Sequence, residues 1–367
     1  MLITGLWSCA SDDPLPVVTV IGDSLNDVGA LGFKATIQDS ANPKGYPLWT
    51  QIVANSYGAD GSAQCAYYIS DKAGGFTTST NAACTNFGIS GARIVAGASK
   101  GSSSPLNVGM QMQARASRGS FNSSELLLVN GGGNDIADLV GLYLGAAGGG
   151  QGLAAFQQFL NQQVDSATLS SLLAQPTGPA LAAGVYMQKL AETFHSQVSS
   201  QLLDKGAQRV LILNVPDITL TPRFKAVLIG VTAQAGAPAA LQLQGAIRQW
   251  VAAFNQQLSI KAAADPRLLV VDFNASFSDV VQNFSSSKYA LTNASDAACP
   301  VTGVADGLPV YDFPSCTSQA LDSIQGKSVG WWKTYLFSDG FHPSPRGHEI
   351  MAQTVREGMV SKGWLPR

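Results

Sequence analysis

Charged residues are scarce in this chain: Lys, Arg, Asp and Glu make up 13% of its 367 residues, about half of the usual share. The net charge is only -2, which excludes the basic footprint that nucleic-acid binding requires. No run of 18 apolar residues is present, so the sequence predicts no membrane-spanning helix. With three histidines and cysteine spacings that do not fit a zinc site, no metal is expected.

In place of charge the chain has apolar and small polar residues. Hydrophobic residues reach 46%, which predicts a packed globular protein, and abundant Gly, Ala, Ser and Gln are common in exported bacterial proteins. Near the N-terminus, Leu6-Trp7-Ser8-Cys9 resembles the end of a bacterial lipoprotein signal, although no Lys or Arg precedes Lys34. We expect residues 1–14 to be a tail, either the remnant of such a signal or a floppy segment with an incidental cysteine. In the first case, lipidation of Cys9 would attach the protein to a membrane, and the expected location is secreted, periplasmic or outer-membrane.

The four remaining cysteines fall into two close pairs. In an exported protein the natural pairing is Cys65 with Cys84 and Cys299 with Cys316, although four cysteines allow three connectivities. Each bridge would stabilise the fold by about 3 kcal/mol, because it restricts the unfolded chain.

Short apolar runs alternate with helical patterns along the chain. Buried strands are predicted at 15–21, 125–129, 209–213 and 267–272, and helices at about 178–204, 239–263 and 345–361. A further helix is expected directly after Ser24, and Gly206 stands where the glycine that follows a helix belongs. The alternation predicts an α/β fold with a mainly parallel sheet that is covered on both faces. Ligands of such folds bind at the carboxyl ends of the strands, which here carry Ser24, Asn134, Asn214–Asp217 and Asp272.

Two segments, at about 56–86 and 284–334, break this alternation. Both are rich in Gly, Ser and Asp, and each contains one of the cysteine pairs. We interpret them as loop insertions that form walls or lids near the site, within a single catalytic domain that spans 15–367.

The segment Gly22-Asp23-Ser24-Leu25 lies between the first strand and the helix expected after it. A serine there is lifted out of the sheet edge, and its N–H, at a helix N-terminus, can stabilise an oxyanion. Taken alone, the tetrapeptide is weak evidence, because Asp and Ser are ordinary helix-capping residues.

Asp339-Gly340-Phe341-His342 precedes the last expected helix. In a turn, this spacing lets the carboxylate of Asp339 accept from the Nδ1–H of His342, which leaves Nε2 free as a base. A serine hydroxyl is a weak nucleophile without such a base, so the motif matters only if His342 reaches Ser24. In isolation, a surface turn explains the motif better.

Two glycine-containing segments offer hydrogen-bond donors. In Gly132-Gly133-Asn134-Asp135 the glycines let the backbone approach a ligand, and the Asn134 amide can donate to an oxyanion. The alternative is a glycine-rich turn in which Asn134 caps the next helix. Residues 87–92 contain a further glycine, Gly91, whose N–H can serve the same purpose.

These four segments, in their order along the chain, resemble the SGNH or GDSL hydrolase superfamily over residues from about 17 to 360. The resemblance implies a three-layer α/β/α fold and a catalytic triad of Ser24, Asp339 and His342. It also implies an oxyanion hole formed by the Ser24 N–H together with Gly91 and Asn134.

Further segments are similar to the phospholipase/lecithinase/hemolysin-like branch of GDSL lipases and esterases, which includes autotransporter esterases. They are residues 214–222 and 289–299. Two departures bear on substrate class rather than on the chemistry: residues 45–49 replace a Gly-Arg-Phe-Ser-Asn-Gly stretch, and Ser338 replaces a common tryptophan.

Three other residues fit a catalytic role less well. Ser99 lies in a Gly-x-Ser-x-Gly segment, but that motif needs a strand before it and a helix after it, and a loop follows here. His195 lies in the middle of an expected helix and should pack or face solvent. His348, at the start of the last helix, is expected beside the site or on the surface.

Several residues near the motifs are candidates for substrate binding. Trp331, Trp332 and Tyr335 lead into the triad and either line an acyl pocket or belong to the core. Asp23 and Asp135 either orient their neighbours or cap helices, and Asp23 is also a candidate for contact with substrate.

The sequence therefore predicts a serine ester hydrolase of the carboxylesterase or lipase type, acting on lipid or small-molecule esters without metal or cofactor. A carbohydrate O-deacetylase or an acyltransferase would use the same triad. A binding module that kept the fold without turnover is the alternative from another class.

Overall fold

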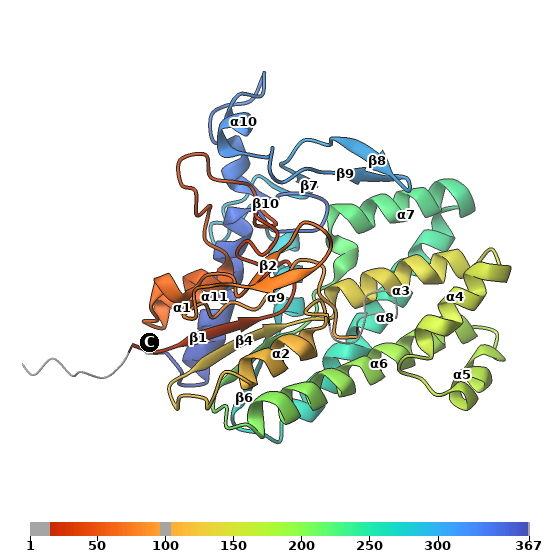
Figure 1. The fold of residues 1–367 in the computed structure, drawn as a ribbon. Helices are drawn as coiled ribbons and strands as arrows, with labels where there is room; N and C mark the ends of the chain where they lie inside the picture. The colour runs from red at the N-terminus through yellow and green to blue at the C-terminus, as the bar shows by residue number, and fades with distance from the viewer. Residues whose placement is uncertain (1–14, 96–103, 366–367) are drawn as a thin grey trace, which may run out of the picture.

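The structure, a computed structural model, describes residues 15–95 and 104–365. Its central sheet has four parallel strands in the order β1-β4-β5-β6 (Figure 1). They are β1 (Val18–Ile21), β4 (Leu126–Asn130), β5 (Val210–Leu213) and β6 (Leu268–Val271). All residues of β1, β4 and β5 are buried, because helices cover both faces of the sheet. The four strands predicted from the sequence are confirmed to within a few residues.

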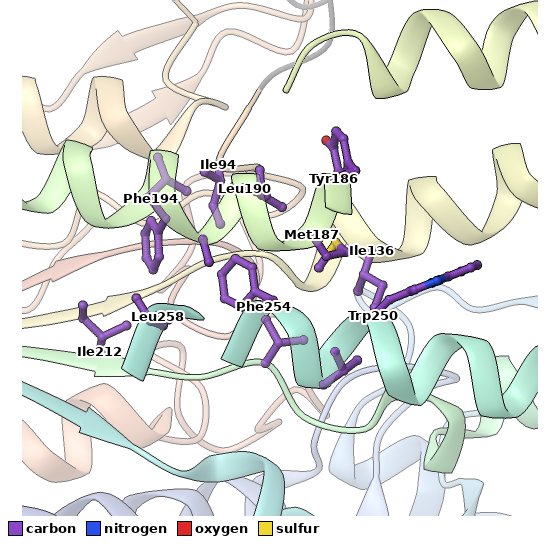
Figure 2. Close-up of a cluster of buried hydrophobic side chains, with 14 of the residues drawn as sticks. Ile94, Ile136, Tyr186, Met187, Leu190, Phe194, Ile212, Trp250, Phe254 and Leu258 are labelled. Carbon is purple, nitrogen blue, oxygen red and sulfur yellow. The ribbon is translucent and has the colours of Figure 1, made fainter. Parts of the chain in front are cut away.

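One face of the sheet packs against four helices. They are α2 (Val108–Ala116), α3 (Gly133–Ala146), α6 (Gly178–Val198) and α8 (Ala237–Ala262). In the core of this layer, shown in Figure 2, the rings of Phe194 on α6 and Phe254 on α8 stack with centroids 6.3 Å apart, in the same cluster as Ile212 of β5. Helix α6 continues into a π-helical turn that ends at Leu203, and Gly206 follows with φ of 107°, as a glycine after a helix requires.

The opposite face packs against three helices. They are α1 (Trp49–Ser56), α9 (Phe273–Gln282) and α11 (Pro345–Ser361). Since successive strand residues point to opposite faces, Val20, Leu128 and Leu211 pack here, with Trp49 and Val355. The chain thus forms the expected three-layer α/β/α fold.

Three further helices lie beyond the first helical layer (Figure 1). They are α4 (Gly150–Leu160), α5 (Ser166–Leu173) and α7 (Pro222–Ala235). Helix α4 packs on α3, α5 on α6, and α7 on α8.

The helix expected directly after Ser24 is wrong. After β1 the chain runs through turns, and no helix begins between there and Trp49, where α1 starts. One helical turn does form, where the carbonyl of Asp23 accepts two backbone N–H groups. Gly29 and Gly32 then take φ values of 128° and 91°, which a right-handed helix cannot accommodate, so the turn does not propagate. Ser24 therefore lies in a turn and not at a helix N-terminus.

The two segments that break the alternation contain small sheets. In 56–86 there is a hairpin of β2 (Tyr68–Ser70) and β3 (Phe76–Thr78). In 284–334 there are β7 (Asn293–Ala297), a hairpin of β8 (Gly303–Ala305) and β9 (Leu308–Val310), and α10 (Ser318–Asp322). Strand β7 pairs in parallel with β10 (Tyr335–Phe337), which leads to the loop before α11.

Each of these segments is closed by a disulfide with the predicted pairing, Cys65–Cys84 and Cys299–Cys316. Because disulfides persist in oxidising compartments, they indicate an extracellular or otherwise exported protein. Within the described residues, no helix is both long enough and apolar enough to cross a membrane. Cys9 lies outside the described residues, so its lipidation, like the bacterial origin, stays a prediction.

Candidate active site

Ser24 and His342, which are 318 residues apart in the chain, meet at the carboxyl end of β1. The Nε2 of His342 lies 2.8 Å from the Oγ of Ser24. On the other side of the ring, Nδ1 lies 2.9 Å from the Oδ2 of Asp339. With Nδ1 donating to the carboxylate, Nε2 carries the lone pair and can accept the proton of the serine hydroxyl.

The turn that holds Asp339 and His342 is fixed by the second oxygen of the same carboxylate. Oδ1 accepts the backbone N–H of Phe341 at 2.8 Å and that of His342 at 2.6 Å. Burial of the ring acts to lower the pKa of His342, but the charge of Asp339 and its hydrogen bond together outweigh burial, so this pKa is raised. Burial acts to raise the pKa of Asp339, and His342 and the two N–H donors reverse that effect, so the carboxylate stays ionised.

The three predicted oxyanion donors belong to segments that hydrogen bonds connect with one another and with the nucleophile turn. Among the hydrogen bonds of the described residues, the backbone N–H groups of Ser24 and Gly91 have no acceptor. The loop that carries Gly91 is held against the nucleophile turn, because the Ile89 N–H donates to the Gly22 carbonyl at 3.1 Å. Asn134, in the first turn of α3, donates one Nδ2 hydrogen to the carbonyl of Ala92, the residue after Gly91, at 2.9 Å. The second Nδ2 hydrogen of Asn134 stays free.

The model of the GDSL-like Lipase/Acylhydrolase family matches residues 18–355 of the chain. The chain belongs to this family. Membership identifies it as a serine hydrolase that acts on esters. No curated protein gives a significant match to the chain.

In this GDSL hydrolase, the buried side chains of Asn130 and Asp23 support the turn that carries Ser24. Asp23 accepts from the Asn130 Nδ2 at 2.9 Å and from the Leu25 N–H at 3.0 Å, and burial raises the pKa of Asp23. Gly22 has φ of 150°, and a Cβ added to it would lie 1.8 Å from the Oδ1 of Asn130. Glycine is thus required before Asp23, and Asp23 supports the turn from below, which does not favour a substrate contact.

A second support, which the sequence analysis did not identify, joins the Gly91 loop to α3. The guanidinium of Arg93 contacts both carboxylate oxygens of Asp138, at 2.5 and 2.9 Å, and donates to the Gly91 carbonyl at 2.5 Å. Asp138 lies four residues after Asn134 on the same helix. The pair therefore fixes the Gly91 loop relative to the Asn134 amide.

Asp135 acts as a further link between these two segments. It is buried, and its two oxygens accept the backbone N–H groups of Ile94 and Val95 at 3.1 and 3.2 Å. Burial raises its pKa to about 7. It does not cap α3, whose N-cap is Gly132.

A groove of about 1060 Å³ begins at Asp339 and His342 and leads away between three walls. One wall is α3, with Val140 and Leu144; the second is α7, with Val227 and Val231. The third wall is formed by residues 305–311 of the β8–β9 hairpin. The segment 284–334 therefore forms a wall of this groove, as expected, whereas 56–86 lines a separate cavity of about 660 Å³.

Trp331, Trp332 and Tyr335 lie away from this groove. Trp332 is buried, and its indole N–H donates to Asp322 at 2.9 Å. Trp331 donates to a backbone carbonyl and packs edge-on against Tyr335, with centroids 4.8 Å apart. The core alternative thus describes these aromatic residues better than an acyl pocket, because both indole N–H groups are satisfied within the protein and Tyr335 packs on Trp331. The aromatic residues that do contact His342 are Phe313 and Phe341, with ring centroids 5.5 and 5.8 Å away.

The other two histidines take no part in the hydrogen-bonded series of Ser24, His342 and Asp339. His195 is half-buried on α6, and its pKa is lowered by burial. His348 is fully buried, which lowers its pKa to about 3, so the expectation of a surface position is wrong for it. Its ring instead lies under the start of α1, where Nδ1 accepts from the Trp49 N–H at 3.4 Å. Ser99 lies outside the described residues.

Proposed function

We propose that the protein is a carboxylic ester hydrolase of the lipase type, which cleaves esters of long acyl chains through an acyl-enzyme on Ser24. The observation that carries the proposal is the hydrogen-bonded series from Ser24 through His342 to Asp339, with distances of 2.8 and 2.9 Å. This arrangement meets the geometric requirement for an activated serine.

In the first step, the Oγ of Ser24 attacks the ester carbonyl while its proton passes to the Nε2 of His342. The imidazolium that forms is stabilised by Asp339, which is already ionised. The negative charge on the carbonyl oxygen is held by the N–H groups of Ser24 and Gly91 and by the free hydrogen of the Asn134 amide. His342 then gives the proton to the departing alcohol, and an acyl-enzyme remains. Water activated by the same histidine releases the acid.

The groove supports a long acyl chain over an acetyl group. Its volume of about 1060 Å³ far exceeds what an acetyl group needs, and it reaches His342 directly. Val140, Leu144, Val227 and Val231 line it, and such side chains favour a hydrocarbon.

The test is hydrolysis of p-nitrophenyl esters, from acetate to palmitate, by the wild type and Ser24→Ala. We expect turnover that rises with chain length in the wild type and is lost in Ser24→Ala. An optimum at acetate would favour the O-deacetylase alternative, and transfer to an added alcohol in preference to water would favour the acyltransferase. Equal activity of the two proteins would exclude Ser24 as nucleophile.

A matched pair of variants on α7 tests the groove. Ala226 lines the groove, whereas Ala233 is exposed on the same helix and does not. Ala226→Trp should shift the optimum to shorter esters, because the indole fills part of the groove, and Ala233→Trp should leave it unchanged. A chain-length profile unaffected by Ala226→Trp would exclude the groove as the acyl site.

A further inference from the structure

The segments around the groove are almost free of charge. Residues 139–164 and 226–247 contain no Asp, Glu, Lys or Arg, and 297–311 contains only Asp306. At the chain-wide charged share of 13%, the two longer segments would each carry about three charged residues. They form much of α3, α4, α7 and the first part of α8, and the third segment contains the β8–β9 hairpin. Figure 1 shows these elements at one end of the molecule.

Helix α7 presents an apolar surface to solvent. Only Phe224 of its 14 residues is buried, yet the helix is mainly apolar after Lys225. Ile229 is 70% exposed on α7, and Val304 is 72% exposed on β8. Helix α7 contacts β9, and each of these two residues is adjacent in sequence to a residue that lines the groove. Single exposed apolar residues are common, but a surface helix ordinarily turns charged residues outward.

We propose that this face, made of α7, the start of α8 and the β8–β9 hairpin, rests on the surface of aggregated lipid that carries no net charge. The inference rests on the proposed lipase function. The groove opens between elements of this face, so whatever covers it must also supply the ester. A lipid surface does so, whereas a protein partner or a second copy of the chain would close the groove.

The chemistry of the face selects a neutral surface. Its only Lys and Arg are Lys225 and Arg223, in the first turn of α7, and 226–247 and 297–311 contain none, so the face lacks the cluster of cations that attracts anionic headgroups. Association must then come from apolar side chains that enter the headgroup region, and salt should barely affect it.

Binding to phosphatidylcholine vesicles tests this proposal in the Ser24→Ala background, where no lipid is consumed. Ile229→Asp and Val304→Asp are compared with Ile260→Asp and Val329→Asp. These control residues are 67% and 80% exposed, do not line the groove and lie outside the face, Ile260 near the C-terminal end of α8 and Val329 after α10. We expect each of the first two substitutions to weaken vesicle binding about tenfold or more, because an inserted apolar side chain is replaced by a charge. The two control substitutions should leave binding within twofold.

Several results would overturn the proposal: no vesicle binding by Ser24→Ala, equal losses in the control variants, or binding that needs anionic lipid and disappears with salt. A dimer in light scattering that Ile229→Asp dissociates would assign the face to a second copy. Circular dichroism of each variant checks its fold. Failure here leaves the ester hydrolase intact if Ser24→Ala abolishes hydrolysis of soluble esters, so the two proposals fail separately.

Discussion

Replacing Asn134 by alanine should separate catalysis from stability. Its amide makes one hydrogen bond within the protein, to the Ala92 carbonyl at 2.9 Å, and the side chain is half-buried. Loss of that neutral bond should cost about 1 kcal/mol, which for a chain of this length lowers the melting temperature by about 1 °C. Loss of an oxyanion donor should lower turnover by about 10²–10³-fold, equivalent to roughly 2.7–4 kcal/mol in the transition state.

The assay is steady-state hydrolysis of p-nitrophenyl butyrate together with thermal unfolding of the same samples. We expect kcat to fall with little change in KM, because the amide acts on charge that exists only in the transition state. Asn134→Asp should be at least as slow, since it places an acceptor where a donor is needed. Gln242→Ala serves as the matched control, because this amide lines the groove on α8, and it should keep kcat within about twofold. A folded Asn134→Ala variant with near wild-type turnover, or with a raised KM alone, would refute the role of Asn134 in the oxyanion hole.

Three further predictions concern the triad itself and groups near it. Because the pKa of His342 is raised, kcat/KM should increase with pH, with the midpoint of the rise above pH 6.5. Asp339→Asn should lower turnover by roughly 10³–10⁴-fold and move this midpoint to lower pH. A midpoint that stays in place would contradict the assignment of Asp339 and His342. Arg93→Lys cannot contact Asp138 through two nitrogens and still reach the Gly91 carbonyl, so kcat should fall about tenfold at nearly constant KM, and an unchanged kcat would exclude the positioning role. The pKa of His348 is lowered to about 3, below its unfolded value of 6.5, so the unfolded chain binds a proton below pH 6.5 that the folded protein does not. The free energy of unfolding should therefore fall as pH drops below 6.5, by about 2 kcal/mol at pH 5. In urea unfolding, His348→Gln should remove this part of the pH dependence, and an identical slope in both proteins would refute it.

The sheet could be predicted because each strand is a short apolar run that is followed by polar residues at its carboxyl end, and such runs form buried strands in most contexts. The error after Ser24 has a local cause. Gly29 and Gly32 stop the helix through positive φ values, and a sequence shows that a glycine is present but not which conformation it takes. The disulfides could be predicted because close cysteines in an exported chain leave few pairings, even though sequence alone does not choose among them.

The site could be predicted only in part, because its supports depend on tertiary contacts. Arg93 and Asp138 are 45 residues apart, and no local pattern links a cation in a loop with a carboxylate on a later helix. The aromatic residues before the triad were ambiguous for a different reason. An indole suits a core as well as a pocket, and only the burial of Trp332 with its hydrogen bond to Asp322 decides between them.

The insertion at 284–334 shapes the groove and restrains the catalytic turn at the same time. Its Cys299 N–H donates at 2.7 Å to the carbonyl of Ser338, the residue before Asp339. The Cys299–Cys316 bridge closes a loop that contains the β8–β9 wall of the groove and also Phe313, which packs against the His342 ring. Because one covalently closed loop contacts both substrate groove and base, a change in this loop should alter chain-length preference and turnover together. We therefore expect substrate class and reaction rate in this hydrolase to be coupled through a segment that lies outside the central sheet.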